Sequence, residues 1–130
     1  MDIEEALAAL ERVAAQHGDL QLLVLHGSRS QGSLHDRSDW DLGYLADGSF
    51  DPAALHSDLT RTLATDDVDL VDLARASALL RFRAARDGRR VYEGQPGRFD
   101  AFVLEATRFW CDIEPVVRRA HDAVLSRLPG

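Results

Sequence analysis

The sequence predicts an α/β domain in which helices flank a small sheet. Its 130 residues are the length of one ordinary domain. The apolar residues, 45% of the chain, are sufficient for a packed core. Segments with the helical period alternate with short apolar or alternating runs, as they do in α/β domains. We therefore expect one domain over residues 1–130, with a core over about 1–93 and a helical C-terminal segment over about 97–128.

The first half of the chain predicts two helices and two strands. Residues 2–17 place their apolar side chains on one helical face, and Gly18 ends that helix. The continuous apolar run over 20–26 is typical of a buried strand, and residues 39–45 alternate as a strand does. A capping aspartate followed by proline opens a helix over 51–64.

The second half adds strands and a long terminal helix. Residues 68–73 predict a third strand, 77–86 a helix, and 91–92 a short fourth strand. From about 98 to 128 apolar residues recur every three or four positions, which indicates a long helix. Pro115 must kink or break this helix, because its ring removes a hydrogen bond and clashes with the preceding turn.

Composition excludes several classes of protein. All 15 basic residues are arginine, so Schiff-base lysine chemistry and the lysine-dependent phosphate loop are ruled out. Cys111 is the single cysteine and cannot form an internal disulfide, so the cytoplasm is the expected compartment. We expect no signal peptide, because the first residues are acidic, and no membrane span, because no apolar run approaches the ~20 residues that a span requires. We also expect no zinc site, because the histidines lack zinc-ligand spacing.

The charges are divided unevenly along the chain. Residues 36–72 carry ten aspartates and two arginines, whereas residues 75–90 carry six arginines and one aspartate. This asymmetry indicates a cation site beside an anion site, or simply two solvated faces. The net charge of −7 opposes binding to a polyanion, so we expect no direct nucleic-acid contact. A protein-facing or surface role is favoured for the arginine cluster Arg81, Arg83, Arg86, Arg89 and Arg90.

The pair Gly27-Ser28 follows the first strand and is a candidate phosphate site. A strand that ends in Gly-Ser and feeds a short helix directs backbone N–H groups and a hydroxyl at one point. Glycine lets a phosphate approach the main chain closely. Arg29 could reach the same phosphate, or it could be a solvated loop arginine. Because Gly-Ser is also a common turn pair, this signal depends on the residues that follow.

Two aspartates follow after ten intervening residues, in the sequence Asp39-Trp40-Asp41. On a strand, positions i and i+2 face the same way, so the two carboxylates project side by side. They repel each other unless a cation lies between them, and such oxygen ligands suit Mg²⁺. The alternative is that both belong to a solvated edge or turn. Trp40 and Tyr44 are expected to be packing residues on the opposite face.

Asp69 interrupts the apolar strand over 68–73 and supplies a third carboxylate. If this strand neighbours the one that carries Asp39 and Asp41, the three groups converge into a site for two-metal phosphoryl or nucleotidyl transfer. Asp69 would then act as a metal ligand and as a possible general base. Asp67 shares its face nearer the strand's start and Asp72 points the other way, so we favour Asp69. 

His26 and the aromatic residues of the last helix are interpreted as core residues. His26 is expected at the core or a strand edge rather than in catalysis. The aromatic stripe of the C-terminal helix is first a core face, part of which could dock another protein's helices. Its members are Phe99, Phe102, Phe109 and Trp110.

This pattern resembles the minimal nucleotidyltransferases of the DNA-polymerase-β-like superfamily. More closely, the chain resembles the MntA-type antitoxins of bacterial HEPN/MNT toxin–antitoxin systems. The spacing from Gly27-Ser28 to Asp39-x-Asp41 and the later Asp69 are the specific features. The chain length, the segment over 79–93 and the terminal helix add support.

The resemblance implies a nucleotidyltransferase fold, with a small mixed sheet flanked by helices. It implies AMP transfer from ATP, with Mg²⁺, onto a tyrosine of a HepT-like HEPN ribonuclease toxin, with which the chain would form a hetero-oligomer. Asp39 and Asp41 become metal ligands, Asp69 the third carboxylate, and Gly27 and Ser28 the triphosphate contacts. Two alternatives stay open: an antitoxin that acts by binding alone, and a small-molecule nucleotidyltransferase of the aminoglycoside-modifying kind.

Overall fold

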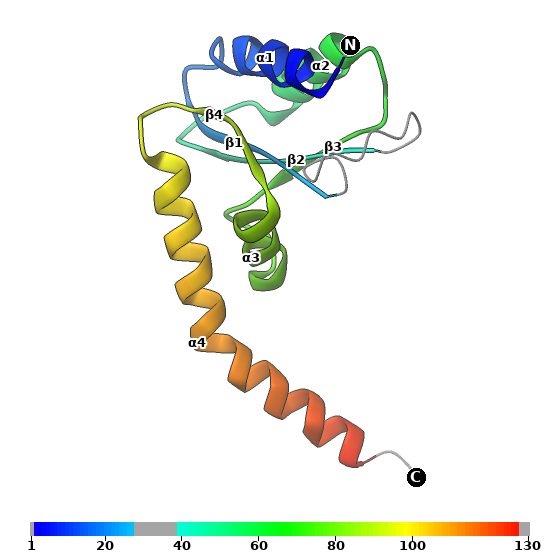
Figure 1. Ribbon diagram of the computed structural model, residues 1–130, viewed down its shortest axis with the longest axis vertical. Coiled ribbons are helices and arrows are strands. Elements are labelled where there is room, and N and C mark those ends of the chain that lie inside the picture. Colours follow the sequence, from blue (N-terminus) through cyan, green and yellow to red (C-terminus); the bar gives the residue numbers. More distant parts are fainter. Residues whose placement is uncertain (1, 28–38, 128–130) are drawn as a thin grey trace.

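The computed structural model describes residues 2–27 and 39–127, in which a four-stranded sheet lies between two pairs of helices (Figure 1). The elements follow the order expected from the sequence pattern. The short helix expected after Gly27-Ser28 lies outside the described residues. In chain order the elements are α1 (Ile3–Ala14), β1 (Leu20–His26), β2 (Trp40–Ala46), α2 (Pro52–Leu63), β3 (Val68–Asp72), α3 (Ala78–Asp87), β4 (Arg89–Glu93) and α4 (Arg98–Ser126).

The sheet is mixed, and its strand order is β3-β2-β1-β4. Strand β1 pairs antiparallel with both β2 and β4, and β2 pairs parallel with β3. The continuous apolar run predicted a buried strand, and residues 22–25 of β1 are indeed 0% exposed. Strand β4 is longer than the predicted residues 91–92, because β1 supplies partners from Leu22 to Leu25. The expected architecture, a small mixed sheet flanked by helices, is confirmed, and its mixed strand directions make it an α+β fold.

Two helices cover each face of the sheet. Helices α1 and α2 cover one face, where Leu10, Leu25, Leu42 and Leu59 are fully buried. Helices α3 and α4 cover the other face, where Phe102 is buried with residues of β1. Alternate residues of β1 and β2 belong to these two cores, as the period of two requires.

The helix ends follow the capping signals with one difference. Asp51 accepts hydrogen bonds from the N–H groups of Ala53 and Ala54, which confirms the predicted start of α2. Helix α1 ends at Ala14, earlier than the residue 17 expected. The chain turns there, and the N–H of His17 donates to the Ala14 carbonyl at 3.0 Å.

Helix α4 is continuous over 29 residues and contains Pro115. It changes direction partway along its length (Figure 1), in agreement with the kink expected from a proline in a helix interior. Its first half packs against α3 and the sheet, and its second half extends away from both. Within the described part of the chain, no helix combines the length and apolar character that a membrane span requires.

Candidate active site

Three neighbouring strands bring one residue each into a row at the end of β1. His26, the last residue of β1, lies opposite Asp41 of β2 in the antiparallel register. Asp41 lies beside Asp69 of β3 in the parallel register. Directly paired residues project from the same sheet face, so the imidazole and the two carboxylates form a row across the sheet. Leu25 and Leu42, the neighbours of His26 and Asp41 along their strands, belong to the core under α1 and α2. Since neighbouring residues of a strand face opposite sides of the sheet, the row faces the side that α3 covers.

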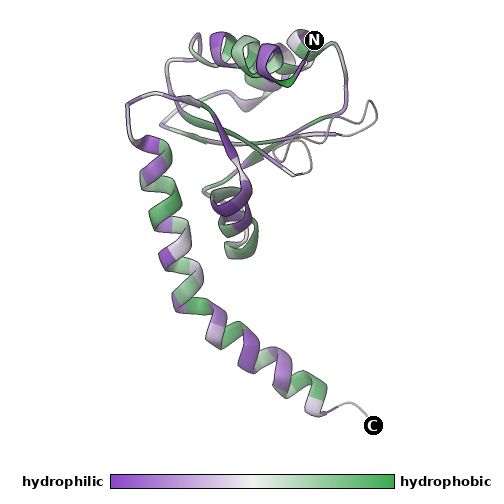
Figure 2. Ribbon diagram, viewed as in Figure 1, coloured by the Kyte–Doolittle hydropathy of each residue, from purple (hydrophilic) through white to green (hydrophobic). Residues whose placement is uncertain are grey.

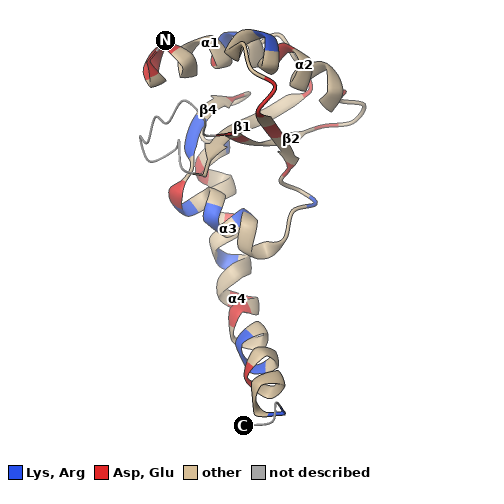
Figure 3. Ribbon diagram, turned by 90° about the vertical axis from the view of Figure 1, so that its right-hand side faces the viewer, with Lys and Arg blue, Asp and Glu red and all other residues tan. Residues whose placement is uncertain are grey.

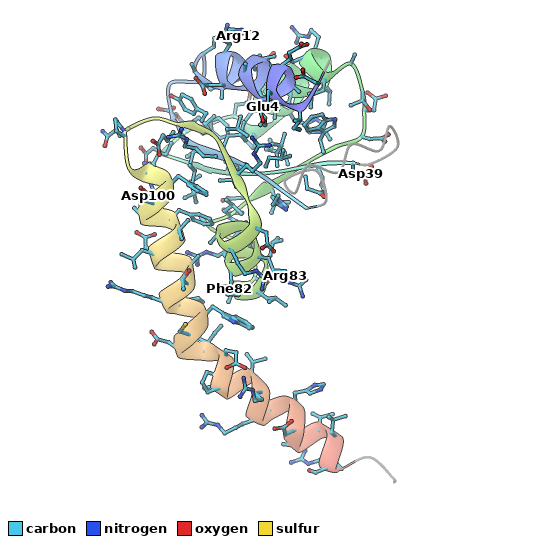
Figure 4. All side chains as sticks on the ribbon, viewed as in Figure 1. Glu4, Arg12, Asp39, Phe82, Arg83 and Asp100 are labelled. Carbon is cyan, nitrogen blue, oxygen red and sulfur yellow. The ribbon has the colours of Figure 1, made fainter. Side chains whose placement is uncertain are left out.

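Asp39 lies just before β2, two residues from Asp41, and is exposed. Figure 4 shows Asp39 at the side of the sheet away from Asp100, which marks the start of α4. The charges of both Asp39 and Asp69 act on the Asp41 carboxylate, so the three carboxylates lie in one region of the molecule.

The other two acidic candidates on or near β3 have structural contacts. Asp72 pairs in register with Tyr44 and so lies on the opposite face, as its position in the sequence predicted. Its carboxylate accepts a hydrogen bond from the N–H of Ala74 at 3.0 Å. The backbone carbonyl of Asp67 accepts the N–H of Trp40 at 2.9 Å, which ties the start of β3 to the start of β2.

Gly27 lies directly after His26, and its backbone requires glycine for two reasons. Its φ is +74°, in the left-handed region that L-residues rarely adopt. A Cβ at this position would lie 2.3 Å from Oδ2 of Asp41. The missing side chain of Gly27 therefore leaves the space that the Asp41 carboxylate occupies.

The pKa values of Asp41 and His26 are both shifted in this row. Burial raises the pKa of Asp41; the neighbouring His26 opposes that shift, and the carboxylates of Asp69 and Asp39 add to it. Burial lowers the pKa of His26, although Asp41 and Asp69 act in the opposite direction. The negative charge of Asp41 is therefore costly in the protein alone, and a bound cation would relieve that cost.

Across residues 2–27 and 39–127, no group of three or more His, Cys, Asp or Glu side chains has an arrangement that holds a metal ion by itself. Mg²⁺ usually takes only one or two protein carboxylates and completes its shell with water and substrate phosphates. The chemistry of Asp39, Asp41 and Asp69 fits such a partial ligand set.

His26 was interpreted from the sequence as a core or edge residue, yet it lies beside two candidate site residues. Its Nε2 atom is buried and has no hydrogen-bond partner among the described residues. The only signal available in the sequence was its place next to Gly27. Its pairing with Asp41 depends on an antiparallel register that local patterns do not fix.

Ser28 and Arg29, the other predicted phosphate contacts, lie outside the described residues. Within the described residues, the arginine cluster is largely engaged in contacts inside the chain. Four guanidinium groups contact other side chains: Arg81 lies over the Phe109 ring, Arg86 contacts Phe82 and Asp87, Arg89 pairs with Glu4, and Arg90 pairs with Glu93. Figure 3 shows the positive charge on α3 as blue segments below the sheet.

Curated relatives share part of this chain. It is 31% identical over 96 residues to the protein adenylyltransferase MntA of Aphanizomenon flos-aquae, an alignment that covers 64% of this chain and 63% of the relative. It is 40% identical over 79 residues to the protein adenylyltransferase MntA of Shewanella oneidensis, covering 58% and 56% of the two chains. The matched region thus spans less than two thirds of either relative.

Solved structures match over nearly the whole length. One is a chain of a toxin–antitoxin crystal structure with AMP-PNP, at 29% identity and a TM-score of 0.73, covering 95% of this chain and 98% of that one. Another is a chain of a variant MntA–HpeT toxin–antitoxin complex, at 30% identity and a TM-score of 0.73, covering 96% and 99%.

The family comparison covers the sheet and all the candidate site residues. The model described as "Polymerase beta, Nucleotidyltransferase" matches residues 8–96, from within α1 to just before α4. The matched region includes Gly27, Asp39, Asp41 and Asp69. The chain therefore belongs to the polymerase beta family of nucleotidyltransferases.

Proposed function

We propose that this chain is a Mg²⁺-dependent adenylyltransferase and antitoxin, which transfers AMP from ATP to a tyrosine of a HepT-like HEPN ribonuclease toxin and so silences it. The observation that carries this proposal is the site itself, where Gly27 gives Asp41 its space and Asp41 lies beside Asp69. The similarity to two MntA adenylyltransferases and to toxin–antitoxin structures supports the choice of substrate and partner.

Asp39, Asp41 and Asp69 are the residues that would hold Mg²⁺. When bound, the ion supplies charge neutralisation for the triphosphate and polarises the acceptor hydroxyl. The raised pKa of Asp41 supports this assignment: burial is its main cause, repulsion from Asp69 and Asp39 adds to it, and a bound cation would relieve the cost of the negative charge. Asp69 lies on the neighbouring strand, where its carboxylate can accept the proton of the acceptor hydroxyl.

The bond changes follow from this arrangement. The tyrosine oxygen forms a bond to the α-phosphorus of ATP, the bond from that phosphorus to the β-phosphate oxygen breaks, and pyrophosphate leaves. Gly27, Ser28 and Arg29 are the candidate contacts for the triphosphate. Since the chain has no lysine, backbone N–H groups, the Ser28 hydroxyl and the Arg29 guanidinium replace the lysine of other phosphate sites.

The proposed partner is a protein and not a nucleic acid, since the net charge is −7. The chain would form a hetero-oligomer with its toxin in the cytoplasm, where the exposed thiol of Cys111 stays reduced.

Incubation with labelled ATP, Mg²⁺ and a HepT-like HEPN protein as the acceptor tests the proposal. The toxin should acquire label, and Asp41→Asn should reduce the rate by ~10²-fold or more. Absence of label on an intact, tyrosine-containing toxin would refute the proposal. If Asp39→Ala with Asp41→Ala still neutralises the toxin fully, the chain acts by binding alone. Label on a small acceptor such as an aminoglycoside, in the absence of toxin, would instead favour a small-molecule enzyme.

A further inference from the structure

The imidazole of His26 carries a buried nitrogen atom that nothing in the described chain satisfies. Strand β1 is hydrophobic over most of its length (Figure 2), and His26 is the polar residue that ends it. Its Nε2 atom is shielded from solvent and has no hydrogen-bond partner within the described residues. A buried polar atom without a partner costs stability, so such an atom in a native protein commonly marks a place where a water molecule or an ion binds.

The contacts of the ring indicate that Nε2 is a hydrogen-bond acceptor. Burial lowers the pKa of His26, so the ring is neutral at pH 7 and carries one proton. A hydrogen bond with the backbone of Leu42 favours the protonated ring, which identifies the Leu42 carbonyl as the acceptor in that bond. Since Nε2 has no partner, the proton in that bond lies on Nδ1, and the neutral ring presents a lone pair at Nε2.

Three acceptor groups are thus neighbours in the row. His26 lies opposite Asp41, Asp41 lies beside Asp69, and the charges of both carboxylates act on the ring. A lone pair and two carboxylates repel one another unless a donor or a cation lies among them. No three of the described His, Cys, Asp and Glu side chains are arranged to ligate one ion directly. An ion held by the carboxylates would therefore reach the ring through a water molecule, which can donate a hydrogen bond to Nε2.

We propose that Nε2 of His26 accepts a hydrogen bond from a water molecule of the hydrated Mg²⁺ ion that the carboxylates hold, and that His26 is thereby a positioning residue for that ion. This inference rests on the proposed function, because it takes the carboxylate row to be the Mg²⁺ site. Mg²⁺ gives up its water reluctantly and usually keeps several waters in a protein, so a fixed acceptor beside the carboxylates stabilises the hydrated ion. Groups in this outer position typically change metal affinity by ~10- to 100-fold.

The alternative role of His26 is packing at the end of β1. In that case phenylalanine, which also has a planar ring, would replace it without effect on metal binding. Glutamine keeps an oxygen at the position of Nε2, two bonds beyond Cγ, whereas asparagine keeps polar atoms only at the position of Nδ1. These three substitutions separate the shape of the ring from its Nε2 atom.

Metal binding by the nucleotide-free full chain provides the test. Mn²⁺, which like Mg²⁺ prefers six oxygen ligands, is titrated into each protein, the free ion is measured by electron paramagnetic resonance, and Mg²⁺ is then added to displace it. His26→Phe and His26→Asn should weaken the Kd of both ions by ~10-fold or more, whereas His26→Gln should stay within ~3-fold of the wild type. His17→Phe is the matched control and should change neither Kd by more than ~2-fold. His17 is also a partly buried histidine, but its Nε2 atom pairs with Asp58 of α2 at 2.8 Å.

A measurement on the wild type needs no substitution. Pulsed electron paramagnetic resonance of the bound Mn²⁺ should detect a weak nitrogen coupling, as expected for a ring one water molecule away from the ion. A coupling as strong as that of a directly bound imidazole would make His26 a ligand and overturn the inference. The absence of any nitrogen coupling would overturn it as well.

The outcomes separate this inference from the proposed function. Equal metal affinities for the wild type, His26→Phe and His26→Gln would overturn the inference, even with AMP transfer intact. An equal loss in His26→Gln and His26→Phe would assign His26 to packing and also overturn it. Metal binding that depends on Nε2, without AMP transfer to a HepT-like HEPN protein, would support the inference and contradict the enzyme assignment. Failure of the wild type to bind Mn²⁺ would overturn the inference, while AMP transfer by the same protein would uphold the proposed function.

Discussion

Gly27→Ala isolates the contact between the glycine turn and the candidate metal ligand Asp41. The new Cβ would lie 2.3 Å from Oδ2 of Asp41, where ordinary contacts begin at 3.4 Å, so the carboxylate must move by roughly 1 Å. A displacement of that size in a reacting site costs ~10²-fold in rate. The left-handed φ of +74° adds a strain of about 1–2 kcal/mol for an L-residue.

Gly48→Ala is the matched control for this substitution. Gly48 also has a positive φ, +54°, but nothing lies within 4 Å of a Cβ built on it. Both variants should therefore lose about 1–2 kcal/mol of unfolding free energy to backbone strain, or roughly 4–8 °C in Tm by thermal denaturation, and Gly27→Ala should lose more because its Cβ also displaces the Asp41 carboxylate. Only Gly27→Ala should lose AMP transfer to the toxin. Transfer rates for the two variants within threefold of each other would refute the assigned role of Gly27.

Three further substitutions test electrostatics and packing. Asp41→Asn should raise the free energy of unfolding at pH 7, because the raised pKa of Asp41 means that its ionised carboxylate costs stability. In urea titrations, the difference in unfolding free energy from the wild type should shrink as the pH falls and vanish below about pH 4. Gly43→Ala would place a Cβ 2.7 Å from a terminal carbon of the fully buried Leu73. This overpacking should lower the free energy of unfolding by about 1–3 kcal/mol in denaturation experiments, and a second substitution, Leu73→Val, should restore part of the loss. Glu93→Gln should destabilise the start of α4 at pH 7, since the Glu93 carboxylate accepts the N–H of Phe99 at 3.0 Å and its pKa is lowered. Circular dichroism melts should show that difference disappear as the pH falls through the lowered pKa of Glu93.

Local patterns were sufficient for the elements of this fold. The apolar run of β1, the alternation of β2 and the Asp51-Pro52 start of α2 each predicted an element that the structure contains. The early end of α1 was not predictable, because there the chain turns back toward α2. His17 bonds to Asp58 of α2 at 2.8 Å, and this contact spans 41 residues of sequence.

The candidate site was predictable as a set of residue types and not as a geometry. The period of two predicted Asp39 and Asp41 on one face and Asp72 on the other, and the register confirms this for Asp41 and Asp72. The position of Asp69 beside Asp41 needed the parallel pairing of β2 with β3, which is a long-range property of the sheet. The same holds for His26, whose place in the row depends on the register of β1 against β2.

The exposed second half of α4 has a consequence for local unfolding of the protein. The residues of α4 from Pro115 to Ser126 are all exposed. A helical segment of this length with so little packing is only marginally stable in water, because most helical stability in proteins comes from packing. This segment should therefore open independently of the sheet and exchange its amide hydrogens much faster than β1 does. It should also be the first place cut by a protease. Any molecule that packs on this segment would have to supply the free energy that orders it, so its binding should be visible as amide protection confined to one end of one helix.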